Sequence, residues 1–156
     1  MSPLASRAPR RGGRLARLIA VPRQRRALLA EAVFELALAA VTIRLLPFSR
    51  TLAFAARPLR KDRLAAPALL AEIVTRAARL VPFRAVCFQQ GFALQRMARR
   101  RGIDARLHYG VGTDPPYKRE LGDKGLHAHV WITVGGVGVL GHEQAVHFRE
   151  LLCSPA

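Results

Sequence analysis

Two side chains in the second half of the chain could together form a nucleophile. Cys87 lies just after Pro82, at the start of a helix that we expect to end before Gly102. A thiol in a first helical turn meets the positive end of the helix dipole, which stabilises the thiolate and lowers the pKa of the thiol. His129 would take the thiol proton and later protonate a leaving amine. Gly91, one turn beyond Cys87, would let a neighbouring element approach closely.

The histidine belongs to an alternating run of side chains. His127, His129 and Trp131 share one face of a predicted strand, since successive side chains of a strand point to opposite faces. Trp131 would either shield the site from water or pack in the core. The other face is expected to enter the core: Ala128, Val130 and Ile132. Two non-catalytic interpretations remain open. Cys87 could be a buried structural cysteine, or the histidines of the strand could simply lie on the surface.

Zinc binding is the competing chemistry for these residues. Thiolate and imidazole ligands are offered by Cys87, His127, His129 and His142. No Cys-x-x-Cys pair and no acidic cluster accompanies them, so we predict no metal and no other cofactor. Cys153, near the end of the sequence, is expected to be incidental.

Periodicity predicts the helices that must position this site. Apolar residues recur at three and four positions from Leu28 to Ile43, which predicts a helix that ends before Pro47. Further helices are predicted over residues 64–81 and 85–101, the last of which carries Cys87.

Strand signals follow the last predicted helix. Apolar and polar residues alternate over 103–111 and again over 127–134. Gly135-Gly136 predicts a hairpin turn into a strand over 137–140. Helices followed by an antiparallel sheet, with the Cys87 helix packed on it, predict an α+β fold.

Composition limits the class of protein. The chain has 156 residues, of which 51% are hydrophobic and only 2 are cysteines, which predicts one globular domain rather than a disulfide-rich secreted scaffold. No run is long and uncharged enough for a membrane span, so we expect a cytoplasmic protein. Three segments are predicted: a flexible basic tail (1–26), a helical region (27–81) and a catalytic core (82–156).

Positive charge is concentrated in the first half of the chain. The net charge is +16, and residues 1–63 contribute 14 basic against 3 acidic side chains. An alternative function is therefore a non-catalytic basic protein that binds nucleic acid or an acidic partner. Base-stacking aromatics are not interleaved with the arginines, so nucleic acid is the less favoured partner. Arginine clusters such as Arg99–Arg101 are expected to lie on solvated faces.

Several motifs together resemble a known family. They are Leu46-Pro47-Phe48, Cys87-Phe-Gln-Gln, Arg100-Arg-Gly-Ile-Asp-Ala-Arg-Leu107, Tyr109-Gly-Val-Gly112 and His127-Ala-His-Val-Trp131. In this order the chain is similar to the transglutaminase-like cysteine proteases of lasso-peptide biosynthesis, the protease half of the split B protein. The resemblance covers the chain from about Leu28 onward.

This resemblance implies a papain/transglutaminase-like core and a bacterial cysteine peptidase that removes the leader from a ribosomally made lasso precursor peptide. The implied partners are the leader, a small leader-recognition protein and an ATP-dependent cyclase. The family nucleophile falls on Cys87 and its histidine on His129. The third member, usually Asp, falls near Gly141, so Glu143 is the nearest acid that could orient His129. A dyad without an acid, or another acid such as Asp114 or Asp123, stays open.

Overall fold

Four α-helices precede the first strand in the part of the chain that the structure describes. The computed structural model describes residues 22–55, 66–113 and 126–154. Its helices are α2 (Arg23–Leu45), α3 (Phe48–Ala55), α4 (Pro67–Ala78) and α5 (Cys87–Arg99). The predicted helices α2, α4 and α5 are confirmed within a few residues, whereas α3 was not predicted. None of the described helices is both long and apolar enough to cross a membrane.

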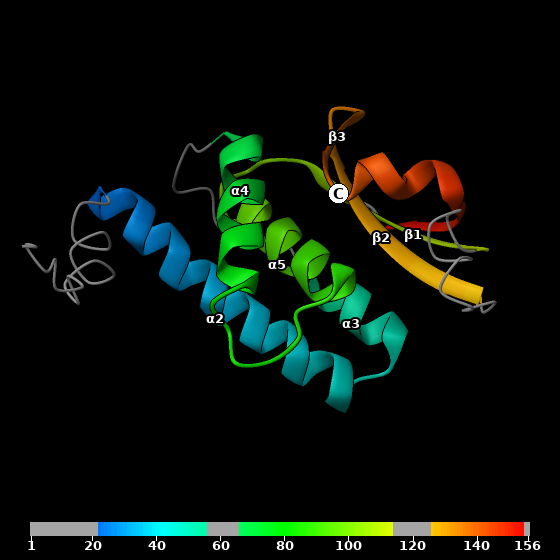
Figure 1. Cartoon of the computed structure of the whole chain (residues 1–156), viewed down its shortest axis with the longest axis horizontal. Helices are drawn as coiled ribbons and strands as arrows, with labels where there is room; N and C mark the ends of the chain where they lie inside the picture. The colour runs from blue at the N-terminus through cyan, green and yellow to red at the C-terminus, as the bar shows by residue number, and fades with distance from the viewer. Residues whose placement is uncertain (1–21, 56–65, 114–125, 155–156) are drawn as a thin grey trace, which may run out of the picture.

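Helix α5 lies between the other helices and the sheet (Figure 1). It packs against α2 and α4 on one side and against strands β1 (Ala105–Thr113) and β2 (Leu126–Val134) on the other. The core is continuous across this arrangement. Its largest fully buried apolar side chains include Leu36, Leu70, Leu94, Leu107 and Ile132. The N-terminal helices therefore share a core with the cysteine-bearing helix.

The sheet has four strands in the order β3-β2-β1-β4, and every neighbouring pair is antiparallel. Strand β3 spans Val137–Leu140 and β4 spans Arg149–Ser154. Gly135 and Gly136 both have positive φ, as a tight hairpin turn requires. The predicted α+β fold, with the Cys87 helix on an antiparallel sheet, is confirmed.

Two elements that we did not predict follow strand β3. Residues after Leu140 form a 3-10 helix, η1 (His142–His147), and then the edge strand β4. Strand β4 shows no alternation of burial, because five of its six residues are exposed, so periodicity could not reveal it. Cys153 is therefore part of the sheet.

The predicted flexible tail overlaps a helix. Helix α2 begins at Arg23, so the last four residues of the segment 1–26 are helical. The remainder of that tail, and the alternative acids Asp114 and Asp123, lie outside the described residues.

Arginines that we expected on solvated faces instead join α5 to α2. Glu35 is fully buried and pairs with Arg96 at 2.7 Å and with Arg100. Glu31 pairs with Arg101 at 2.6 Å. Arg96 and Arg101 are themselves buried. A buried charge is tolerated only when it is paired and hydrogen-bonded, so this network fixes the position of α5 relative to α2.

Candidate active site

Cys87 is the first residue of α5, and two glutamines hold the chain where the helix begins. The Gln89 side chain accepts a hydrogen bond from the Val86 backbone N–H at 3.1 Å. The Gln90 side chain donates to the Ala85 carbonyl at 2.8 Å. Both glutamines belong to the Cys-Phe-Gln-Gln motif, but sequence reasoning assigned them no role. They fix the turn that presents the thiol.

Gly91 allows α5 to approach strand β2. A Cβ atom at this position would lie 2.6 Å from Cγ1 of Val130, a distance that real contacts do not show. The close approach predicted at Gly91 is therefore confirmed. Strand β3 ends opposite Ile132, so it does not cover β2 at Val130. At this uncovered edge the Val130 backbone N–H lies beside the Cys87 thiol.

Cys87 and His129 are brought together as predicted. Burial alone would raise the pKa of the Cys87 thiol, but a hydrogen bond to the His129 side chain lowers it. The Val130 and Phe88 backbone N–H groups and the charge of His129 act in the same direction. The net effect places the thiol pKa below its ordinary value of 9.0. A thiolate, not a thiol, is the nucleophile, so the environment favours the reactive form.

The other side of the imidazole contacts a backbone carbonyl. His129 Nε2 lies 2.8 Å from the Gly141 carbonyl oxygen. A carbonyl can only accept a hydrogen bond, so Nε2 carries the proton, and in the neutral ring the lone pair is then on Nδ1. This tautomer leaves Nδ1 as the base for the thiol. His129 is also buried, with 7% of the residue exposed, so the interpretation of His129 as a surface residue is wrong.

A comparison with known families agrees with this geometry. The family model described as Transglutaminase-like superfamily matches residues 28–153, which is most of the chain. The chain belongs to the transglutaminase-like superfamily. No curated protein and no solved structure matches it.

Glu143, the acid predicted to orient the histidine of this transglutaminase-like chain, lies on η1. Its side chain is exposed, and Nε2 of His129 has the Gly141 carbonyl as its partner. Gly141 has φ +66°, and a Cβ atom there would lie 2.9 Å from the Val130 carbonyl and 3.1 Å from His129 Nε2. Glycine therefore lets the carbonyl reach the ring. A backbone acceptor leaves no mark in a residue pattern, so sequence reasoning missed it.

Trp131 is buried next to the histidine. Its ring is 5% exposed, and it stacks on His108 with a centroid distance of 5.4 Å and lies 6.2 Å from His129. A Cβ atom on Gly110 would lie 2.9 Å from the Trp131 ring, so this glycine makes room for the indole. Phe148 covers the other side of His129 at 4.9 Å. The aromatic rings thus restrict the orientation of the imidazole.

The zinc set that we considered is not brought together. His142 packs over Gly138 of β3. His127 is half-buried, while Ala128, expected in the core, is exposed. Within residues 22–55, 66–113 and 126–154, the group of possible metal ligands that gathers is a different one: His108, Glu150 and Cys153.

Proposed function

We propose that this transglutaminase-like chain is a cysteine peptidase that removes the leader from a lasso precursor peptide during its maturation. The observation that carries the proposal is the Cys87–His129 hydrogen bond at the start of α5, which lowers the thiol pKa. The family membership supports thiol chemistry. The sequence motifs listed above support the narrower substrate.

The reaction proceeds through a thioacyl-enzyme. Sγ of Cys87 attacks the carbonyl carbon of the scissile peptide bond, and the backbone N–H of Cys87 stabilises the oxyanion. His129 carries the thiol proton to the leaving amine as the C–N bond breaks. Water, deprotonated by His129, then attacks the thioester, which releases the leader carboxylate and restores the thiol.

In this scheme the Gly141 carbonyl does the orienting work that a carboxylate does in a complete triad. It fixes the tautomer with Nδ1 as the base and turns the ring toward Cys87. Unlike a carboxylate, a neutral carbonyl adds no full negative charge beside the imidazolium that forms during the reaction. We therefore describe the machinery as a Cys–His dyad with a backbone acceptor.

The substrate is expected to arrive with partner proteins. We propose that the basic N-terminal half docks an acidic surface of the leader or of a small leader-recognition protein, and that an ATP-dependent cyclase consumes the product. Docking by exposed charges is screened within about 10 Å at 0.1 M salt. Four arginines are chosen for neutralisation: Arg10, Arg11, Arg25 and Arg26. Neutralising these four arginines should raise KM more than it lowers kcat. If the affinity for the partner stays unchanged across a salt series, the proposed docking role of the basic half is rejected.

The test of the activity is direct. The full chain is incubated with a leader-containing precursor and the leader-recognition protein, and the products are measured by mass spectrometry. We expect the leader and core peptides as separate fragments. In the presence of hydroxylamine, the thioester should also give the leader hydroxamate. Absence of both products, together with salt-sensitive binding to duplex DNA, would favour the non-catalytic alternative.

A further inference from the structure

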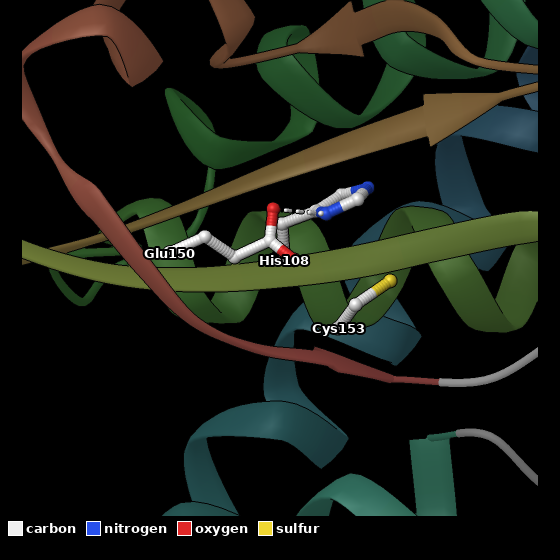
Figure 2. Close-up of side chains that lie close together, drawn as sticks. All are labelled: His108, Glu150 and Cys153. Atoms are coloured by element: carbon white, nitrogen blue, oxygen red, sulfur yellow. Dashed lines mark hydrogen bonds and ion pairs between the residues drawn. The ribbon is translucent and has the colours of Figure 1, made fainter.

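A second cysteine–histidine group lies on the sheet, outside the site described above. Figure 2 shows His108 on β1 with Glu150 and Cys153 on the neighbouring strand β4. His108 and Cys153 are directly opposite each other in the β1–β4 pairing. One ligand atom from each of the three side chains lies within 4.8 Å of the others.

From this cluster we propose that His108, Glu150 and Cys153 form a zinc-binding site. Imidazole nitrogen, carboxylate oxygen and thiolate sulfur are the three ligand types that zinc takes from proteins. With metal–ligand distances of about 2.0–2.3 Å, tetrahedral zinc needs its ligand atoms about 3.3–3.8 Å apart. The His108–Glu150 separation of 3.1 Å is already close to this range, and no pair of the three atoms must approach by more than about 1.5 Å. Water would fill the fourth position.

The two proposed ligands on β4 are the side chains with room to move toward a metal ion. Glu150 is 47% exposed at its side chain and Cys153 is exposed, and both belong to an edge strand. His108 is the fixed member, since its side chain is 14% exposed and its ring is stacked on Trp131. The site is therefore expected to close by rotamer changes of Glu150 and Cys153 rather than by movement of His108.

A hydrogen bond behind the histidine favours a metal on the cluster side. His108 Nε2 lies 2.8 Å from the Thr133 hydroxyl oxygen, and Nδ1 lies 3.1 Å from Glu150 (Figure 2). Metal-bound histidines usually donate their other ring N–H to such an acceptor, which fixes the ring. Thr133 can accept from Nε2–H, and the lone pair on Nδ1 then faces Glu150 and Cys153.

Zinc binding has a defined proton balance. Without metal, Nδ1 of His108 contacts the Glu150 carboxylate and Nε2 contacts the Thr133 hydroxyl. With metal, the ring proton is on Nε2 and the Cys153 thiol proton is released to solvent. A thiolate ligand requires loss of the thiol proton, so binding should weaken as the pH falls.

The experiment uses Co²⁺ as a spectroscopic probe for zinc and the full chain with Cys87→Ala as its host. The chain has two cysteines, so a thiolate-to-cobalt absorption band in this variant comes from Cys153. We expect this band, tetrahedral cobalt bands and their loss on addition of Zn²⁺. Trp131 is the chain's sole tryptophan, and its contact with His108 should make its fluorescence fall as Co²⁺ binds.

Further substitutions in the Cys87→Ala host test each ligand. Cys153→Ser should abolish the charge-transfer band, and His108→Ala or Glu150→Gln should weaken binding at least about tenfold. Thr133→Val should weaken it about 10–100-fold, whereas His147→Ala, an exposed histidine on η1, should not. Absence of the band in the host, or its persistence after Cys153→Ser, would overturn the site. The host lacks the catalytic thiol, so either result is independent of the peptidase proposal.

Discussion

The chain's two cysteines both lie beside a histidine of the same sheet, yet their surroundings differ. Cys87 begins a helix and meets an imidazole whose far nitrogen is held by a neutral carbonyl. Cys153 lies on an exposed edge strand, where a carboxylate approaches both the thiol and the histidine. The first environment lowers the pKa of its thiol and the second raises it.

The difference indicates that proximity to a histidine does not by itself make a cysteine nucleophilic. Backbone N–H groups and an imidazole stabilise a thiolate at Cys87, and Nε2 of that imidazole contacts the neutral Gly141 carbonyl. At Cys153 burial, and then the charge of Glu150, raise the pKa of the thiol and disfavour the thiolate. The same two residue types are therefore assigned different chemistry in the two proposals, nucleophilic catalysis at Cys87 and metal binding at Cys153.

The largest expected effect separates the two cysteines by activity. Cys87→Ala should lower the cleavage rate of a leader-containing precursor by at least about a thousandfold, since it removes the attacking atom. Cys153→Ala should leave the rate within about twofold, because no bond of the proposed reaction involves it. Both rates are measured by product chromatography. Full activity of the Cys87→Ala protein would contradict the cysteine-peptidase mechanism.

The second prediction concerns the helix that carries the reactive cysteine. Glu35→Ala should lower the free energy of unfolding by about 3–5 kcal/mol, because it removes the buried carboxylate that pairs with the buried Arg96 and with Arg100. The matched control is Glu72→Ala, which breaks an exposed pair with Arg25 and should cost about 0–1 kcal/mol. Urea unfolding followed by circular dichroism gives both values. Equal values would show that the buried network does not hold α5.

A third prediction concerns the Gly141 carbonyl, which contacts Nε2 of His129. Gly141→Ala should lower kcat about tenfold or more with little change in KM, because the new methyl group displaces the His129 ring. Gly136→Ala is the control, since it has the same unfavourable positive φ but nothing within 4 Å of its Cβ atom. It should lose stability and keep kcat. Equal losses of kcat in both variants would refute the role of the carbonyl.

Thiol reactivity provides the fourth prediction. Iodoacetamide should alkylate Cys87 faster than Cys153 at neutral pH, although Cys153 is the more exposed thiol. As the pH falls from 9 to 6, the rate at Cys153 should fall about tenfold per unit. The rate at Cys87 should fall only once the pH passes below its lower pKa. Peptide mass spectrometry measures the two sites in one sample, and parallel pH profiles would contradict the difference between them.

The smallest expected effect concerns Glu143. Glu143→Gln should keep kcat within a few-fold of the original value, because the Gly141 carbonyl already holds Nε2. Steady-state kinetics on the precursor measures this. A fall of a hundredfold or more, with KM unchanged, would return the orienting role to Glu143.

Much of the fold was accessible from the sequence where one face of an element is buried. The recurrence from Leu28 to Ile43 predicted α2, and the alternation from His127 to Val134 predicted β2. Gly135-Gly136 predicted the hairpin that forms β3. Strand β4 was missed because most of its side chains face solvent, and a strand without a buried face has no two-residue period.

The site was predictable only as far as side chains define it. Cys87 and His129 were found because their residue types suggest a reaction and the predicted elements bring them together. Every residue type has a backbone carbonyl, and the direction of the Gly141 carbonyl depends on backbone angles. Sequence alone could therefore not identify it as the partner of His129. The pairing of Glu31 and Glu35 with arginines could not be predicted from a local pattern, because the arginines lie more than 60 residues away in the sequence.

The buried pair between Glu35 and Arg96 also has a consequence for the order of folding. The two residues are separated by 61 positions, so α2 is synthesised well before its partner exists. At about 5–20 residues per second, the interval is about 3–12 s. During this time the carboxylate of Glu35 must stay in water, and α2 cannot settle in its final place. Arg96 follows Cys87 by nine residues, so the nascent chain gains Cys87 and the arginine that anchors its helix within the same short stretch of synthesis.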